Sequence, residues 1–572
     1  MCGIVGYIGG RDCPEIIFNG LKRLEYRGYD SAGIAVISGE GLDVRRAAGK
    51  LSNLHREIEK NPLNGSCGIG HTRWATHGKP SEDNAHPHRS GGVVVVHNGI
   101  IENFLELKEM LTGNGFAFSS ETDTEVIAHL INYYIMQGKD FFSASALALK
   151  DLKGSYAISA VCAEEPDRIV VAKNSSPLII GIGNGENFCA SDIPAILEHT
   201  RDVIILDEGE IGVVRQDSVK VFELSNLAEK KKTVTNITWS PVMAEKGGYK
   251  HFMLKEISEQ PRVFIDTIRG QFSLTRKEVT FSNSEDIAHA FSSSSRIWIV
   301  ACGTSYHAGL VGKYMIERIA GIPVEVDIAS EFIYRNPCIK KGDMLIAVSQ
   351  SGETIDTLSA IKEAKRAGIS VLGICNVVGS SIARESDYVI YTHAGPEISV
   401  ASTKAFTTQI AVLYILAILI GKKNGSQKES EVTGLLDRMV HIPALMEEFL
   451  KQNAYLREIA RKYFTAKNFL YLGRNILFPV ALEGALKLKE LSYIHAEGYA
   501  AGEMKHGPIA LIDEDFPTMA LIPQGSWYEK TYSNLQEIRA RSGRIIAVAS
   551  EGDEQINRIA DDVIRVPNGD PL

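Results

Sequence analysis

The sequence predicts an α/β protein with several domains, in which stacked sheets with covering helices come first and doubly wound parallel sheets follow. Its 572 residues are enough for about three domains, each large enough to bury a core. Glycine-punctuated runs of strand-forming residues fill the chain up to about residue 236, and strand and helix patterns alternate after it. The first pattern is typical of stacked sheets, and the second of parallel sheets joined by helices.

The first part of the chain contains several runs typical of strands. They are Gly33 to Ile37, Gly92 to Val96, Tyr156 to Val161, Arg168 to Ala172 and Val203 to Leu206. The polar stretch from Lys230 to Gly248 is interpreted as a linker, and its three consecutive lysines as a solvated run of charge.

Strands and helices alternate in the second part. The expected order is a strand at Ile297 to Ala301, a helix from about Ser305, a strand at Met344 to Val348, a helix from about Thr354 and a strand at Val371 to Cys375. The apolar run Ile410 to Gly421 is too short to cross a bilayer, so it predicts a buried helix.

An internal duplication is visible in this second part. The strand that starts at Ile297 corresponds to one that starts at Phe469, and the strand near Leu345 to one that starts near Ala520. Two similar units of equal size indicate a duplicated domain, although any two strand–helix–strand units share some likeness. We therefore divide the chain into 1–238, a linker and lead-in helix at 239–284, and two domains at 285–425 and 455–572.

Composition limits the function classes. A net charge of -9 and a pI near 6.0 argue against general binding to nucleic acid or acidic membranes. No charged segment followed by an apolar stretch opens the chain, so we expect no secretory signal. The eight cysteines are scattered without metal-type spacing, which predicts a reducing cytoplasm and no metal site.

Cys2 follows the initiator methionine directly. Removal of Met1 would leave a thiol and an α-amino group on one residue. Because the neutral amine can accept the thiol proton near neutral pH, such a residue carries its own nucleophile and base. The alternative is a small residue that opens an apolar first strand.

Three further segments favour the chemical interpretation. They are the segments 71–78, 97–103 and 121–125. An amino-acid substrate needs a cation for its carboxylate, an anion for its ammonium group and donors for the oxyanion formed at its amide; Arg73, Asp123 and the pair Asn98-Gly99 supply these. Three alternatives stay open. Arg73 and Asp123 could form an ordinary ion pair, Asn98-Gly99 could be a hairpin turn, and His71 or His77 could be an ordinary polar residue with its hydrogen bonds satisfied.

With these segments, residues 1 to about 240 resemble the glutaminase domain of the N-terminal-nucleophile amidotransferases. Leu24 to Gly33 and His71 to Gly78 match the isomerising glutamine–fructose-6-phosphate aminotransferases closely. The resemblance implies a four-layer α-β-β-α glutaminase domain followed by two sugar isomerase domains. It also implies that Cys2 is catalytic, that Asn98 and Gly99 hold the oxyanion, that Trp74 gates an ammonia passage, and that glutamine is bound by Arg73, Thr76, His77 and Asp123.

The first isomerase domain carries a pattern that favours an anion. The strand ending at Val348 runs into Ser349-Gln350-Ser351-Gly352-Glu353-Thr354 and then into a helix, so hydroxyls and backbone amides meet at a helix N-terminus. Helix-capping serines are common, but Thr304 and Ser305 follow the preceding strand as well. The second copy has Gln524 to Tyr528 at this place, so we expect one phosphate site per chain. By resemblance Ser305, Ser349, Gln350, Ser351 and Thr354 would bind the phosphate of fructose 6-phosphate, with Thr304, Val400 and Ser402 as further sugar contacts.

The second isomerase domain contributes acid–base groups. Glu483, Lys487 and Glu490 share one helix face at i, i+4 and i+7, a spacing that usually means a surface salt bridge. Movement of a proton between two sugar carbons needs a base, and the resemblance assigns this role to Glu490, with Lys487 and Glu483 beside it. It also makes His506 an acid–base group that reaches the site of a neighbouring subunit, which implies a homodimer.

The resemblance implies transfer of the glutamine amide nitrogen to fructose 6-phosphate and isomerisation to glucosamine 6-phosphate, without a cofactor. The family has a C-terminal tail with a lysine that binds the open sugar, whereas this sequence stops at Leu572. We therefore expect little glucosamine 6-phosphate from the chain as written. The alternatives are an amidotransferase or deglycase for another sugar, and a phosphosugar sensor with a vestigial glutaminase.

Overall fold

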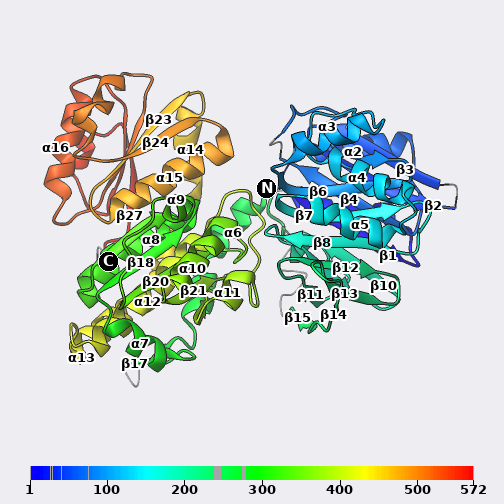
Figure 1. Cartoon of the computed structure of the whole chain (residues 1–572). Helices are drawn as coiled ribbons and strands as arrows, with labels where there is room; N and C mark the ends of the chain where they lie inside the picture. The colour runs from blue at the N-terminus through cyan, green and yellow to red at the C-terminus, as the bar shows by residue number, and fades with distance from the viewer. Residues whose placement is uncertain are drawn as a thin grey trace. The chain divides into compact units, whose positions relative to one another are not determined.

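The computed structural model describes residues 2–25, 28, 30–39, 41–74, 77–237, 246–273 and 278–570. The chain divides into two compact units, Met1–Glu245 and Lys246–Leu572 (Figure 1).

The first unit contains two antiparallel sheets. The eight-stranded sheet has the order β15-β11-β9-β10-β1-β4-β2-β3 and the seven-stranded sheet the order β14-β13-β12-β8-β7-β6-β5. The strands of the first are β1 (Gly3–Gly9), β2 (Ser31–Ser38), β3 (Gly41–Ala48), β4 (Cys67–Arg73), β9 (Ile179–Ile182), β10 (Glu186–Ala190), β11 (Asp202–Ile205) and β15 (Thr235–Asn236). Those of the second are β5 (His88–Ser90), β6 (Val93–Ile101), β7 (Gly154–Cys162), β8 (Ile169–Asn174), β12 (Glu210–Val214), β13 (Val219–Glu223) and β14 (Glu229–Lys230).

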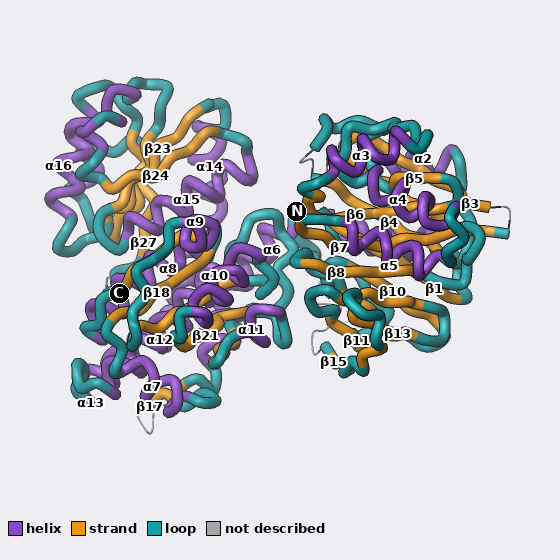
Figure 2. The backbone as a smooth tube through the Cα atoms, in the orientation of Figure 1, coloured by secondary structure: helices purple, strands orange, loops and turns teal. Residues whose placement is uncertain are grey.

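The two sheets pack face to face, and helices cover their outer faces. One apolar core joins side chains of β1, β2 and β4 to side chains of β6, β7 and β8. Helices α1 (Cys13–Arg23) and α2 (Leu51–Lys60) cover the first sheet, and α3 (Phe104–Gly113), α4 (Glu125–Met136) and α5 (Phe141–Asp151) cover the second. The four-layer prediction is therefore confirmed; Figure 2 shows the strands in orange beside the purple helices.

Burial explains why the central strands read as continuous apolar runs. Val93 to Val96 on β6 are at most 1% exposed, because one face of the strand meets the other sheet and the other face meets helices. At about 1.5–3 kcal/mol for each fully buried side chain of this size, these four residues anchor the strand firmly. The chemistry-bearing residues that follow on β6 thus extend from a rigid element.

Two interpretations of the sequence were wrong in this unit. Asn98-Gly99 is not a hairpin turn, because β6 continues to Ile101 and pairs with β7 throughout. The lysine run is not a merely solvated linker either. Lys230 lies in β14, and Lys232 Nζ lies 2.8 Å from the buried Glu210 carboxylate, since a buried charge requires a partner.

The second unit contains two five-stranded parallel sheets with the orders β19-β18-β20-β21-β22 and β24-β23-β25-β26-β27. Their strands are β18 (Arg296–Ala301), β19 (Val324–Ile328), β20 (Asp343–Ser349), β21 (Ser370–Cys375), β22 (Tyr388–Tyr391), β23 (Asn468–Gly473), β24 (His495–Ala500), β25 (Thr518–Ile522), β26 (Ile545–Ser550) and β27 (Asp562–Val566). The orders match strand for strand, and β18 and β23 start 172 positions apart (468 − 296), so the predicted duplication is present in the fold.

Helices join and cover these sheets. They are α6 (Phe252–Ile268), α7 (Ser284–Ser292), α8 (Gly303–Ala320), α9 (Ala329–Tyr334), α10 (Ile355–Arg366), α11 (Ser381–Glu385), α12 (Lys404–Lys423), α13 (Glu429–Leu450), α14 (Asn453–Tyr463), α15 (Leu477–Ser492) and α16 (Tyr528–Arg539). A two-stranded ribbon, β16 (Phe272–Ser273) with β17 (Glu278–Val279), precedes α7. In each sheet the second strand in chain order pairs with one edge of the first strand, and the third strand pairs with its other edge. The strand order therefore reverses between β18 and β20, and open α/β sheets bind ligands at the carboxyl ends of strands at such a point.

One helix among the described residues has the length and composition of a membrane span. It is α12, and 83% of its most apolar 18-residue window is buried within the second unit. Its apolar side chains belong to the core beneath the first parallel sheet. The sequence prediction of a buried helix at Ile410 to Gly421 is confirmed.

Candidate active site

Cys2 lies immediately before β1, beside the carboxyl end of β4. Strand β1 pairs with β4 so that Gly3 faces Thr72, which brings Cys2 next to the residues after Arg73. The Trp74 amide donates a hydrogen bond to Cys2 Sγ over 3.3 Å. The Cys2 thiol in turn lies 3.6 Å from the Trp74 carbonyl oxygen, so the Trp74 backbone holds the sulfur in place.

Asn98 reaches Cys2 from the facing sheet. Its Nδ2 donates to the Cys2 carbonyl oxygen over 3.0 Å, and its Oδ1 lies 3.0 Å from His71 Nε2. The same His71 nitrogen lies 3.1 Å from the His97 carbonyl oxygen, which can only accept, so Nε2 carries the proton. His71 thereby fixes the Asn98 amide with its Nδ2 toward Cys2.

Burial keeps His71 neutral. Its side chain is fully buried, and desolvation lowers its pKa to about 3. The ring of His86 stacks on it with centroids 4.0 Å apart, and burial lowers the pKa of His86 as well. A neutral imidazole with a fixed tautomer is a suitable support for a hydrogen-bond donor beside a nucleophile.

Gly99 occupies a position that only glycine can fill. Its φ is 137°, and a Cβ atom there would lie 2.0 Å from the Ser155 carbonyl oxygen on β7. A side chain would push β6 away from β7 and displace the peptide that follows Asn98.

Arg73 and Asp123 lie in the same region. Arg73 is 4% exposed; its Nη2 donates to the carbonyl oxygens of His77 and Gly78, and its Nη1 has no hydrogen-bond partner among the described residues. Burial lowers the pKa of the guanidinium, while the nearby Cys2 and Asp123 act in the opposite direction. Asp123 Oδ2 accepts from the Ile101 amide at 2.9 Å. A buried cation with an unused donor beside a nucleophile can bind a carboxylate.

Not every predicted residue of this site can be placed. Thr76 lies outside the described residues. The carbonyl of His77 accepts from Arg73, and its ring packs edge-on against Phe104 at 5.4 Å. Trp74 is 42% exposed, with its backbone on Cys2.

The predicted anion cradle lies at the carboxyl end of β20. Ser349 Oγ lies 3.0 Å from Thr354 Oγ1 and accepts from the Gly352 amide at 3.0 Å, and Ser351 Oγ accepts from the Glu353 amide at 3.2 Å. The hydroxyl groups of this loop are therefore held by hydrogen bonds within the loop itself, just before α10 begins. Gly352 is required, because its φ is 68° and a Cβ there would lie 2.0 Å from Ser380 Oγ.

The neighbouring strand β18 brings further hydroxyls to the same edge. Ser305, in the first turn of α8, is 8% exposed and accepts from Gln409 Nε2 at 3.0 Å. Since β18 and β20 are adjacent and parallel, Ser305 and Ser349 lie at neighbouring strand ends. A helix N-terminus and several hydroxyls at one edge can hold a phosphate.

The acid–base groups on α15 form a connected network with α8. Lys487 Nζ donates to Glu490 Oε2 at 2.6 Å and to Thr304 Oγ1 at 3.1 Å, and it lies 3.3 Å from Glu483 Oε1. Thr304 Oγ1 in turn donates to Glu483 Oε1 at 2.9 Å. The side chains of Glu483 and Lys487 are 7% and 17% exposed, so these residues do not form an ordinary surface salt bridge.

The comparisons with known proteins agree with both sites. A model of a glutamine amidotransferase domain matches residues 71–198, and a model of the SIS domain matches residues 290–419 and 462–571. A glutamine–fructose-6-phosphate aminotransferase [isomerizing] from Clostridium tetani is 49% identical over 569 residues, which covers 99% of this chain and 93% of that protein. The same enzyme from Chlorobaculum tepidum is 51% identical over 575 residues, with the same coverage.

The chain belongs to the isomerising glutamine–fructose-6-phosphate aminotransferase family.

One solved structure agrees with the second half of this aminotransferase fold. The C-terminal domain of a glucosamine-fructose-6-phosphate aminotransferase from Francisella tularensis is 41% identical, with a TM-score of 0.55. It matches 57% of this chain and 91% of that domain. The sequence prediction of the family, of the fold class and of an aminotransferase enzyme is confirmed.

Some predicted residues of the aminotransferase are not brought together within one chain. His506 lies in a short 3-10 helix after β24, is exposed, and makes no side-chain hydrogen bond to another described residue. Val400 is 46% exposed, and Ser402 is half-buried in the same loop before α12. The buried Glu256 carboxylate fixes the start of this loop, because it accepts a hydrogen bond from the Ile398 amide at 2.6 Å.

Sequence reasoning missed three residues that position the sites. They are His71 beneath Asn98, His307 beside Glu483, and Glu353, whose carboxylate accepts from the Ser381 amide and hydroxyl. A signal existed for His307, because it follows Thr304 by three positions and so shares its helix face. For His71 the signal was a polar residue in the middle of a buried strand.

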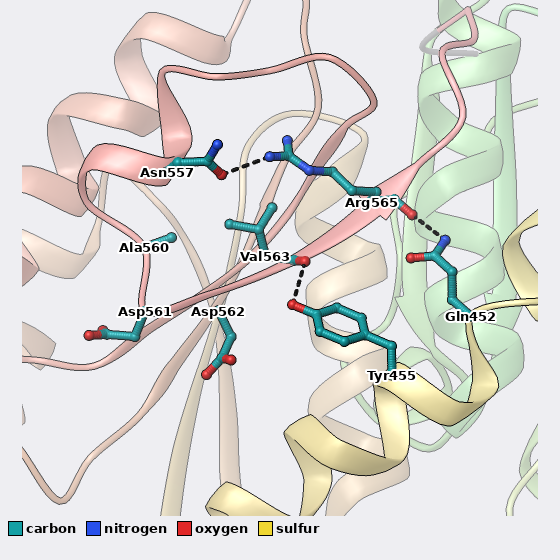
Figure 3. Close-up of a pocket in the computed structure, with 8 residues that line it drawn as sticks. All are labelled: Gln452, Tyr455, Asn557, Ala560, Asp561, Asp562, Val563 and Arg565. Carbon is teal, nitrogen blue, oxygen red and sulfur yellow. Dashed lines mark hydrogen bonds between the residues drawn. The ribbon is translucent and has the colours of Figure 1, made fainter.

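Two further features concern ligands. Among the described residues no group of three or more histidine, cysteine, aspartate or glutamate side chains is placed to hold a metal ion. A surface pocket of about 530 Å³ lies between α14 and β27 (Figure 3). It is lined by Gln452, Tyr455, Asn557, Ala560, Asp561, Asp562, Val563 and Arg565. None of these is a predicted site residue, so the pocket is separate from the chemistry.

Proposed function

We propose that this chain performs the family reaction with Cys2 as the glutamine nucleophile and Glu490 as the base of the sugar reaction. Nitrogen passes from the side-chain amide of glutamine to fructose 6-phosphate, glutamate is released, and the aminated sugar is isomerised to glucosamine 6-phosphate. The observation that supports this most is the contact set of Cys2: a backbone donor on its sulfur and the Asn98 amide on its carbonyl.

The first half-reaction takes place at Cys2. Its α-amine accepts the thiol proton, and Sγ attacks the glutamine amide carbon. Asn98 Nδ2 and the Gly99 amide donate to the oxyanion that forms there. The carbon–nitrogen bond breaks, the nitrogen leaves as ammonia with the transferred proton, and water then hydrolyses the γ-glutamyl thioester to glutamate.

Glutamine is oriented by charge. Arg73 Nη1, buried and without a partner among the described residues, binds the α-carboxylate, and Asp123 binds the α-ammonium group. Thr76 and His77 are the further glutamine-binding residues of this proposal, and Trp74 gates the passage of ammonia. The passage matters because ammonia that reaches water near neutral pH is mostly protonated and no longer nucleophilic.

The sugar reaction belongs to the second unit. Ser305, Ser349, Gln350, Ser351 and Thr354 bind the phosphate, with Thr304, Val400, Ser402 and Glu483 as further sugar contacts. Glu490 removes a proton from C1 of the aminated sugar and returns it at C2, and the Lys487 ammonium donates to Glu490 Oε2 at 2.6 Å and so holds the carboxylate in place.

Three finer points belong to the same proposal. The exposed His506 acts in the site of a second copy, so the working enzyme is a homodimer. The enzyme works in a reducing cytoplasm. The domain limits 1–238, 239–284, 285–425 and 455–572 are kept as the proposed division.

Isotope transfer tests the proposed roles. With glutamine labelled by ¹⁵N at the side-chain amide, mass spectrometry is expected to find the label on C2 of the glucosamine 6-phosphate that forms, even where the amount of this product is small. Cys2→Ala should remove label transfer while leaving sugar binding, and Glu490→Gln should leave glutamate release intact. Label transfer from glutamine by the Cys2→Ala variant would refute the nucleophile assignment.

A further inference from the structure

A chain of polar contacts connects α8 of the first isomerase domain to α15 of the second, two helices that lie side by side (Figure 1). It runs from His307 through Glu483 to Thr304 and Lys487, and from Lys487 to Glu490. Four of these residues were expected from the sequence to take part in the reaction. His307 was not, and nothing in the proposed reaction yet uses it.

His307 makes a short contact with Glu483. Its Nδ1 lies 2.7 Å from Glu483 Oε2, and the side chains of the two residues are 14% and 7% exposed. A carboxylate oxygen accepts, so Nδ1 is the donor. At this distance and burial, the contact is the shortest that Glu483 makes with any of its three partners.

The two oxygens of Glu483 are divided between its partners. Oε1 accepts from Thr304 at 2.9 Å, and Oε2 accepts from His307. With both oxygens occupied, Lys487 lies closer to Glu490, at 2.6 Å, than to Glu483, at 3.3 Å. One ammonium group is thus shared unequally by two carboxylates.

We propose that His307 is a positioning residue for the sugar reaction: it satisfies Glu483 so that Lys487 stays on Glu490. This inference rests on the proposed role of Glu490 as the base. If the imidazole is removed, Glu483 Oε2 becomes a buried carboxylate oxygen without its donor, which is costly. Lys487 is the cation within reach, so it moves toward Glu483 and leaves Glu490.

The position of the donor atom on the ring makes the proposal testable. Nδ1 is separated from Cβ by one atom, as is the Nδ2 of asparagine, whereas the Nε2 of glutamine is one bond further out. His307→Asn therefore keeps a donor at the required place. His307→Leu keeps the bulk without the donor, and His307→Gln keeps a donor at the wrong place.

The measurement is the exchange of the C1 hydrogen of fructose 6-phosphate with solvent deuterium, followed by proton NMR without glutamine in the full chain. We expect His307→Leu and His307→Gln to lose about tenfold or more in kcat, with KM nearly unchanged, because a hydrogen bond to a charged group is lost. We expect His307→Asn to retain most of the rate. The KM for fructose 6-phosphate serves as the folding control for each variant, because glutamate release reports only on the first unit.

Equal rates for the leucine, glutamine and asparagine variants, whether high or low, would overturn the proposal, as would an effect confined to KM. A double variant with Glu483→Gln should be little worse than Glu483→Gln alone, because both changes act through one carboxylate; independent effects would also overturn it. The Glu490→Gln variant distinguishes failure of the proposed base from failure of the proposed role of His307. If it keeps full exchange, the proposed base is wrong, whereas if it abolishes exchange and the His307 variants do not differ, only this inference fails.

Discussion

The two candidate sites of the chain are built in different ways. In the first unit the nucleophile directly precedes a strand, and it is supported by a backbone amide, by a required glycine and by a neutral buried histidine, both of which lie within strands. In the second unit they sit on two helices and are held by ionised side chains that share hydrogen bonds. The first arrangement depends on exact backbone placement and the second on balance of charge, so the two sites should fail in response to different changes.

Replacement of the nucleophile should give the largest difference between the activities of the two sites. Cys2→Ala should lower glutamine hydrolysis by about 10⁴-fold or more, because no other residue can form the thioester. Exchange of the C1 hydrogen of fructose 6-phosphate in the second unit should not change. Loss of both activities together would mean that the two sites are not the independent constructions described above.

The reverse experiment removes the base. Glu490→Gln should lower the C1 exchange by about 10²–10⁴-fold, the usual contribution of a general base, while glutamate release stays at the level of the unaltered chain. Both rates can be measured on one preparation by NMR. A Glu490→Gln chain with undiminished exchange would assign the base to another residue.

Gly99→Ala tests dependence on the backbone in the first unit. The added Cβ would lie 2.0 Å from the Ser155 carbonyl oxygen, so the strand must shift and the oxyanion donors with it. We expect a loss of about 100-fold in kcat for glutamine hydrolysis, similar to removal of an oxyanion donor. Gly113→Ala is the matched control, because a Cβ at the end of α3 meets nothing within 4 Å. Equal kcat values for the Gly99→Ala and Gly113→Ala chains would contradict the claim that the first site depends on exact backbone placement.

The smallest effect concerns stability against pH, and it has opposite signs in the two units. The pKa of His71 is lowered to about 3 by burial, so the unfolded first unit binds protons that the folded unit refuses. Its stability falls as the pH drops from about 6.5 toward 3, by about 1.4 kcal/mol per pH unit for this group. The pKa of Glu256 in the second unit is raised to about 7, by burial and then by Glu397. That carboxyl contributes its full stability below about pH 4.3 and loses it as the pH rises through 7.

Calorimetry can read this difference. When the pH is lowered from 7.5 to 5, the melting temperature of the first unit should fall by more than that of the second. Hydrogen exchange assigns each transition to its unit. A second unit that is the more acid-sensitive of the two would contradict the assignment of these buried groups.

The parts of the fold that could be predicted were those set by local patterns. The runs at Ile297 and Met344 appear as β18 and β20, and the spacing of Glu483, Lys487 and Glu490 places them on one helix face, because the periods of strand and helix are visible in sequence. The catalytic roles of Glu490 and Cys2 were inferred from the family resemblance and not from periodicity.

The parts that could not be predicted depend on contacts across distant segments. The Asn98-Gly99 pair looks like a turn by itself and lies inside β6 only because β7 pairs with it along its whole length. His71 fixes Asn98, and His307 fixes Glu483, through partners 27 and 176 positions away. The lysine run at 230–232 is paired because Glu210 is buried beside it, which no local pattern reveals.

The identity of the nucleophile can be tested directly by mass spectrometry of the purified protein after reaction with an electrophilic glutamine analogue. We predict a chain that begins at Cys2, without the mass of Met1, and carries one analogue on the Cys2 sulfur, with glutamine hydrolysis abolished. A chain that keeps Met1 and still hydrolyses glutamine at full rate, or an analogue attached elsewhere, would contradict it.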